Sequence, residues 1–196
     1  MTLASPDFLK ALIYQAVLIA HLFSFAFAIV LVARADLAML SGAYHAGRRD
    51  LAKDARNTAF WLAMLWISGV ALIGMGIGFD LAAIMANGKV FAKVTVVAIL
   101  TLNGLFLHFY AFPLFAGGQS KITNFQILIC SVAGAISSVS WLFASLFGVA
   151  RKVAPFLSYQ NFMSVYLICL AFGLVIALTF ARPFIRRNFT ASAQPS

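Results

Sequence analysis

Residues 11–33 read ALIYQAVLIAHLFSFAFAIVLVA, and no Asp, Glu, Lys or Arg interrupts them. At about 1.5 Å of rise per helical residue, such a run crosses the roughly 30 Å of hydrocarbon in a bilayer. Backbone amides in hydrocarbon need partners within their own segment, so the α-helix is the expected state. The stretch therefore predicts a transmembrane helix. The histidine near its centre, His21, is a rare residue type in that setting.

Four further runs of the same kind follow this first one. Reading between charged residues places the predicted spans at 11–33, 57–79, 94–116, 123–149 and 159–181. Proline at position 113 and paired glycines at 117 and 118 end the third run, because both residue types break helices. We therefore expect an all-α fold, a polytopic bundle of five transmembrane helices, with residues 1–196 forming a single transmembrane domain.

The composition of the whole chain agrees with this class. Hydrophobic residues make up 63% of the 196 positions, charged residues only 10%, and the mean hydropathy is +0.99. A water-soluble fold has too little polar surface at this composition, so lipid is the expected solvent and partner of most side chains. The net charge of +9 comes from short basic clusters beside apolar runs. This placement favours membrane orientation over nucleic-acid binding.

The distribution of Lys and Arg predicts the direction of insertion. One set of connections and the C-terminal tail hold nine of the 14 basic residues: Arg34, Arg48, Arg49, Lys53, Arg56, Lys121, Arg182, Arg186 and Arg187. The opposite side holds Lys10, Lys89, Lys93, Arg151 and Lys152. The positive-inside rule then places the N-terminus outside and the C-terminus in the cytoplasm of a multi-pass plasma-membrane protein, in a bacterial inner membrane.

The longest connection between spans runs from Arg34 to Arg56 and is too short for a folded domain. Its second half mixes charges at helical spacing, so we expect it to extend the second span as a solvated helix. Asp36 and His45 are assigned to this connection. None of the five acidic residues then lies inside a span, which argues against an acid-driven transporter and against a metal-ion permease with oxygen ligands.

Cysteine and N-terminal patterns add two narrower expectations. Cys130 and Cys169 lie far apart within apolar runs, which predicts buried thiols rather than a disulfide or a zinc site. Asp7 and Lys10 precede the first span, a poor match to a cleaved signal peptide. We therefore expect residues 11–33 to be retained as a membrane anchor.

Small residues recur at helical spacing in two of the spans. They are Gly74 and Gly78 in the second, and Ser131, Gly134, Ser138 and Ser145 in the fourth. Such faces let membrane helices approach closely, because hydrophobic burial offers no net gain within lipid. Helix packing is the simpler interpretation, and room for a flat ligand is the alternative.

Two histidines within spans carry the main functional hypothesis. His21 lies near the centre of the first span, and His108 lies about one turn from the centre of the third. These helices run in the same direction, so the depths of the two residues are expected to agree within about 6 Å. Facing imidazoles at one depth would form a six-coordinate haem b site, with iron as the bound metal. Interhelical hydrogen bonds are the alternative use of both rings.

Three polar residues accompany the two histidines. Tyr14 shares the helical face of His21, and Lys93 lies roughly along the face of His108. Asn103 also lies within the third span. An amide at mid-membrane needs partners, so Asn103 is either a clamp between helices or a donor to a bound ligand. Tyr14, Lys93 and Asn103 therefore complete the candidate cofactor-binding set.

The first 115 residues or so also resemble a known family. His21 is followed by Arg34, and the stretch FAKVTVV at 91–97 leads through Asn103 to His108. This pattern is similar to the superfamily of copper-resistance D proteins and HemJ-type protoporphyrinogen oxidases. The resemblance implies haem b held by His21, with Lys93 near the haem propionates or the substrate. It also implies redox work on a porphyrin or a quinone.

Two classes of function follow from these patterns. The first is a haem b protein acting in electron transfer, porphyrin oxidation or haem handling, which would make it a membrane oxidoreductase. The second is a non-enzymatic component, either a small transporter or a subunit that assembles with a partner membrane protein or with further copies of itself. The Soret absorbance of the purified protein separates these classes, because only the first predicts a bound haem.

Overall fold

The computed structural model describes residues 5–41, 43, 50–112, 114, 123–150 and 152–191. Over this part of the chain the secondary structure is helical, with no strand. Five helices are long and apolar enough to cross a membrane. Their outward faces carry large exposed apolar side chains, such as Phe23 at 61% and Leu102 at 68% exposure. Lipid contact accounts for such a surface, which confirms the predicted class of an integral membrane helix bundle.

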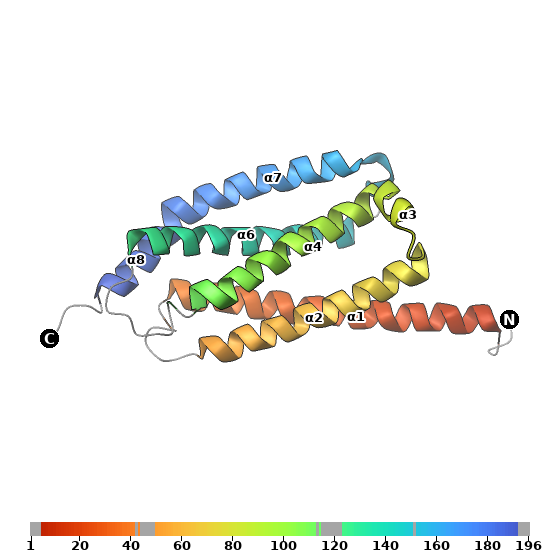
Figure 1. Cartoon of the computed structure of the whole chain (residues 1–196), viewed down its shortest axis with the longest axis horizontal. Coiled ribbons are helices and arrows are strands. Elements are labelled where there is room, and N and C mark those ends of the chain that lie inside the picture. Colours follow the sequence, from red (N-terminus) through yellow and green to blue (C-terminus); the bar gives the residue numbers. More distant parts are fainter. Residues whose placement is uncertain are drawn as a thin grey trace.

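The helices follow the order of the predicted spans (Figure 1). The long ones are α1 (Pro6–Leu40), α2 (Leu51–Gly76), α4 (Gly88–Phe106), α6 (Asn124–Val149) and α7 (Tyr159–Ile176). A π-helical turn, η1 (Leu107–Ala111), continues α4, and another, η3 (Ala177–Ala181), joins α7 to α8 (Arg182–Ala191). The short helices α3 (Leu81–Ala86) and η2 (Ala154–Phe156) lie in two connections.

Polar caps explain where the long helices begin. Ser5, Asp50, Thr123 and Ser158 each accept a hydrogen bond from a backbone N–H in the first turn of α1, α2, α6 and α7. These bonds satisfy donors that have no partner within the helix. The cap at Asp50 starts α2 six residues before the predicted span, so residues 51–56 of the charged stretch are helical, as predicted.

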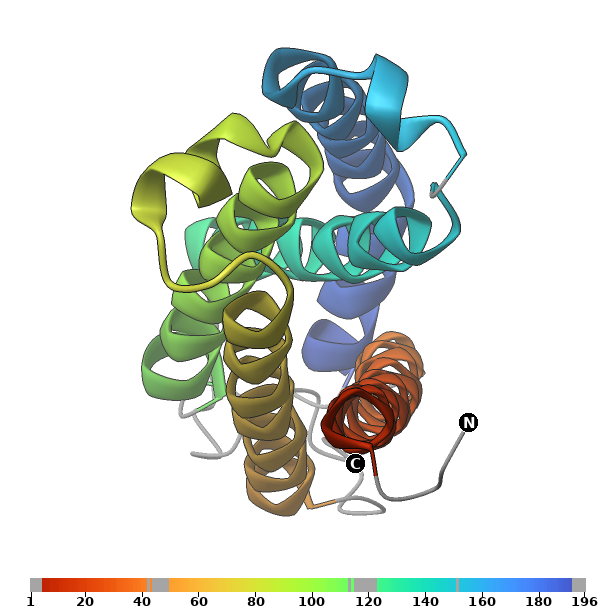
Figure 2. The same cartoon turned by 90° about the vertical axis from the view of Figure 1, so that its right-hand side faces the viewer.

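α6 is the core helix of the bundle and packs against α1, α4 and α7. In its most apolar stretch of 18 residues, 50% of the residues are buried, against 11–17% in the corresponding stretches of the other spanning helices. Viewed along the bundle, α6 lies between the α1–α2 pair and the helices α4 and α7 (Figure 2). The start of α1 and the end of α8 lie at opposite ends of the molecule (Figure 1). We call these ends the N-side and the C-side of the bundle.

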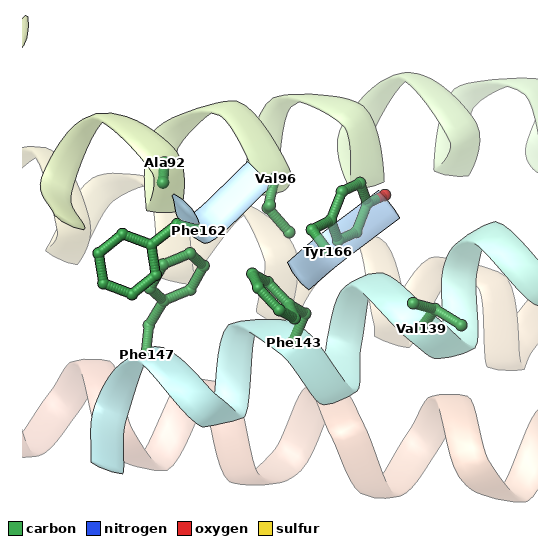
Figure 3. Close-up of a cluster of buried hydrophobic side chains, with 7 residues drawn as sticks. All are labelled: Ala92, Val96, Val139, Phe143, Phe147, Phe162 and Tyr166. Atoms are coloured by element: carbon green, nitrogen blue, oxygen red, sulfur yellow. The ribbon is translucent and has the colours of Figure 1, made fainter. Parts of the chain in front are cut away.

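Two large apolar clusters hold the helices together, and a third, smaller one joins Leu51 of α2, Ala111 of η1 and Cys130 of α6. The larger joins α4, α6 and α7 and consists of Ala92, Val96, Val139, Phe143, Phe147, Phe162 and Tyr166 (Figure 3). The second joins α1, α2, α4 and α6 and consists of Ala28, Val32, Leu65, Leu100 and Trp141. Because lipid tails are as apolar as these side chains, close packing rather than hydrophobic transfer stabilises both clusters.

The structure differs from the sequence-based expectations in two connections. α1 continues to Leu40, so Asp36 lies on a helix and not in the connection to which it was assigned. α2 ends at Gly76, and Gly78 adopts a positive φ of 78° in the turn that follows. The Gly74 surface faces the ring of Phe79, so the predicted Gly74–Gly78 face is not a helix contact. His45, Pro113, the 117–118 glycines and Lys121 lie outside the described residues.

Candidate functional site

His21 lies where α1 packs against α2, in the N-side half of the bundle. Its Nδ1 atom is 2.9 Å from Ser68 Oγ, and the ring is half-buried. A Cβ atom added at Gly69 would lie 3.5 Å from the Cε1 atom of His21, which is ordinary van der Waals contact. Ser68 and Gly69 together thus form the part of α2 that contacts one edge of the imidazole ring.

The hydrogen bonds of Ser68 favour one tautomer of His21. Ser68 Oγ donates to the carbonyl oxygen of Met64, at 2.6 Å, and a hydroxyl has a single hydrogen to donate. When Ser68 donates to Met64, the contact with His21 is a bond donated by the ring, from Nδ1–H to Ser68 Oγ. The lone pair of the neutral imidazole is then on Nε2. This is the tautomer of a metal ligand whose other nitrogen is held by the protein.

Lys93 lies on the same side of the Trp141 cluster as His21, toward the N-side. Leu100 on α4 packs in one cluster with Ala28 on α1. Lys93 is seven positions before Leu100, and His21 is seven positions before Ala28, on helices that run in the same direction (Figure 1). Both residues therefore lie to the N-side of the cluster, each about 10 Å along its own helix from the cluster residue. The Lys93 ammonium is also within electrostatic range of the His21 ring.

The half-buried Lys93 side chain has no ion pair among the residues the structure describes. Cationic side chains inside a membrane are usually paired or serve a pathway or ligand. A cation and an imidazole with a free lone pair, both on the N-side of the Trp141 cluster, can together bind an apolar molecule that carries a carboxylate.

His108 does not meet His21 in this structure. It is eight positions after Leu100, on the C-side of the cluster, so the two histidines lie roughly 20 Å apart along the helix axes. This separation is larger than the roughly 6 Å expected from the sequence. The expected depth of each histidine was measured from the ends of its predicted span. In the structure, however, α1 begins at Pro6 and extends well past the other helices on the N-side (Figure 1).

The surroundings of His108 also differ from those of His21. It lies in η1, is exposed, and has ring contacts with Phe109 and Phe112 of its own helical segment. The structure therefore does not support His108 as an axial ligand opposite His21.

Asn103 serves as a clamp between helices. It is 8% exposed, and its Nδ2 atom donates to the carbonyl oxygen of Ala133 on α6, at 2.9 Å. Of the two roles left open by the sequence, the structure shows this one. Tyr14 is 40% exposed and lies two turns from His21 toward the N-terminus. Neither residue joins the group formed by His21, Ser68 and Lys93.

The sequence alone did not identify Ser68 of this group or the neighbouring Gly69 as contacts of His21. Ser68 and Gly69 lie in a run rich in small residues, and nothing in that run marks the serine as the partner of a histidine 47 positions earlier. The antiparallel packing of α2 on α1 brings them together. A related contact joins α2 to α4, where Trp66 Nε1 donates to Thr101 Oγ1 at 2.9 Å.

The chain matches no protein-family model, no curated protein and no solved structure. The function must therefore be argued from the geometry. Among the described residues, no three His, Cys, Asp or Glu side chains come together as a metal site. A haem iron differs from such centres because it needs only one or two protein ligands. The group formed by His21, Ser68 and Lys93 is accordingly the candidate site, and we call it the His21 site.

Proposed function

We propose that this integral membrane protein binds haem b at the His21 site through a single imidazole ligand. The observation that carries the proposal is the bond from His21 Nδ1 to Ser68 Oγ, because it leaves Nε2 with the lone pair that iron requires. Lys93, also on the N-side of the Trp141 cluster, supplies a cation for a haem propionate. Haem would bring redox-active iron to this site, and the chain holds and orients it.

The donor set fits this group in two respects. A neutral histidine whose second nitrogen donates a hydrogen bond to the protein is a common ligand for haem iron. A propionate buried in lipid requires a positive partner, and Lys93 has no other ion pair in the described part of the chain. Oxidation of a porphyrin, reduction of a quinone and electron transfer are the reaction classes open to such a site.

The test is the Soret absorbance of the full-length protein, purified in detergent and supplied with haem b. We expect a Soret band in the wild type and its loss in His21→Ala. Ser68→Ala should weaken haem affinity by roughly 10- to 100-fold, because the ring loses the partner that fixes its tautomer. Lys93→Met should weaken it on the order of tenfold, and Lys93→Arg should restore much of that loss.

Two variants serve as matched controls. His108→Ala should keep the Soret band, although a site with two facing histidines predicts its loss. Asn103→Leu should also keep the band, since its bond to Ala133 joins helices and touches no ligand. A monodisperse wild-type protein that takes up no haem, or a band that survives in His21→Ala, would contradict the proposal.

One observation favours a purely structural role for His21. Its bond to Ser68 joins α1 to α2, and interhelical hydrogen bonds in membranes contribute about 0.6 kcal/mol on average. In a non-enzymatic membrane subunit or small transporter, His21→Ala would lower stability without any change in absorbance. The same set of variants distinguishes this function from haem binding.

For the orientation, we propose that the N-side faces the outside of the cell and the C-side faces the cytoplasm. The basic residues of α2 and α8 lie toward the C-side (Figure 1), and positive charge accumulates on the cytoplasmic side of membrane proteins. A fluorescent protein that matures only in the cytoplasm, fused to the C-terminus, should therefore be bright. The same fusion at the N-terminus should be dark, and the reverse pattern would invert the topology.

A further inference from the structure

Asp36 lies on the face of α1 that packs against α6. Ala28, Val32 and Asp36 follow one another at intervals of four residues, and the first two are buried against Trp141 of α6. One turn further toward the C-side, Asp36 Oδ2 is 2.8 Å from Ser138 Oγ. A carboxyl group is therefore half-buried in a helix contact at the edge of an apolar cluster.

In the contact of Asp36 with Ser138, two acceptor oxygens lie near one hydroxyl group. Ser138 Oγ is 2.8 Å from Asp36 Oδ2 and 2.9 Å from the carbonyl oxygen of Gly134. A hydroxyl has one hydrogen, so it either donates to one of these two acceptors or shares the hydrogen between them in two weaker bonds. When Asp36 is a carboxylate, its bond from Ser138 is made at the expense of the bond to Gly134.

Adding one proton to Asp36 removes this competition. The carboxylic acid donates to Ser138 Oγ, and Ser138 then donates to Gly134, so that both bonds form together. Protonation also removes a charge from a half-buried position, where an ionised carboxylate is costly. The protonated acid is therefore the form that fits the geometry of the contact between α1 and α6.

The place of this contact in the bundle gives it mechanical importance. α1 packs mainly on α2, whereas α4, α6 and α7 pack on one another. Besides the cluster around Trp141 and the smaller cluster of Leu51, Ala111 and Cys130, the described polar links between these two groups include Asp36–Ser138 and Trp66–Thr101. A change in the protonation of Asp36 thus acts at the contact between the α1–α2 pair and the group of α4, α6 and α7.

The charged and titratable groups on the elements around Asp36 are few. They are Arg34 on α1, Cys130 on α6, Lys53, Asp54 and Arg56 at the start of α2, and Arg182, Arg186 and Arg187 on α8. In the described part of the chain, Ser138 is the side chain recorded in a hydrogen bond with Asp36.

We propose that Asp36 is a proton-binding site that fastens α1 to α6 on the C-side of the bundle. The proton comes from water on that side and resides on the carboxyl oxygen facing Ser138. Release of the proton converts Asp36 to a carboxylate. One of the two hydrogen bonds of Ser138, to Asp36 or to Gly134, is then lost or both are weakened, and the α1–α2 pair packs less tightly on α6. The inference is independent of haem binding, because it involves no residue of the His21 site.

Infrared difference spectra of the full-length protein in liposomes test the first half of this proposal. A pH titration between about 4 and 9 should show the C=O stretch of a protonated carboxylic acid that disappears as the pH rises. The band should be absent from Asp36→Asn. Replacement of the exposed Asp7 by asparagine is the matched control and should leave it unchanged. A band that persists in Asp36→Asn would assign the proton elsewhere and overturn the proposal.

Spin labels test the second half. Leu37 on α1 and Leu142 on α6 are exposed, so cysteines at these two positions can be labelled once Cys130 and Cys169 are replaced by alanine. The distance between the labels should be short and narrowly distributed at low pH, and longer or broader at high pH. Asp36→Asn should keep the short distance at both pH values, because its amide donates to Ser138 as the acid does.

Three results would overturn the proposal. One is a label-to-label distance that does not change with pH in the wild type. Another is an Asp36→Asn protein that responds to pH as the wild type does. The third is a short distance that depends on sodium concentration at constant high pH, which would identify a metal cation rather than a proton as the ligand. Since Asp36→Asn preserves both bonds, it keeps the test valid even if Asp36→Ala fails to fold.

Discussion

Replacing Tyr166 with alanine is expected to lower the free energy of unfolding by about 2–3 kcal/mol. The side chain is 1% exposed and lies in the cluster between α4, α6 and α7 (Figure 3). Its ring centroid is 5.3 Å from that of Phe143. Truncation leaves a cavity whose lining loses dispersion contacts. The effect is smaller than in a soluble core because the separated helices would bury the same ring in lipid.

Tyr166→Phe separates the contribution of the ring from that of the hydroxyl. The Tyr166 hydroxyl is 3.0 Å from Ser140 Oγ, which also donates to the carbonyl oxygen of Ile136. Ser140 therefore keeps a partner in the variant, and the expected loss is about 0.6 kcal/mol. Unfolding in mixed detergent micelles, followed by circular dichroism, measures both variants. Equal losses for alanine and phenylalanine would show that the hydroxyl, not the packing, stabilises this cluster.

Gly88→Ala is expected to destabilise the bundle by about 1–3 kcal/mol. Gly88 begins α4, and a Cβ atom there would lie 2.7 Å from the backbone nitrogen of Tyr159 and 3.1 Å from the carbonyl carbon of Ser158. These are main-chain atoms at the start of α7, so the clash cannot be relieved by rotating a side chain. The first turn of α7 must shift, which disturbs the contact between the rings of Phe91 and Tyr159.

Gly104→Ala is the matched control on the same helix. A Cβ atom at Gly104 would meet no atom within 4 Å outside its own helix. Alanine in a helix interior is favoured over glycine by about 0.5–1 kcal/mol, so this variant should be neutral or slightly stabilised. Thermal unfolding in one detergent compares the two proteins. If Gly88→Ala melts as late as Gly104→Ala, then α4 and α7 do not pack as closely as the structure describes.

The membrane class and the helix spans could be predicted from the sequence. Uncharged runs such as 11–33 leave only helices, because lipid offers backbone amides no other partner. The role of Asn103 was also within reach, since an amide in hydrocarbon must find an acceptor. These inferences needed only the composition of one segment and the properties of the solvent around it.

Relative depth and neighbourhood were decided by the tertiary structure. His21 and His108 were expected to face each other, yet the offset of α1 against α4 sets them on opposite sides of the Ala28–Leu100 level. Ser68 became the partner of His21, and Asp36 the partner of Ser138, through packing between helices far apart in the sequence. Hydrophobic periodicity reveals which residues enter a membrane. It does not reveal how far one helix slides along another, since many offsets bury similar apolar faces and close packing selects among them.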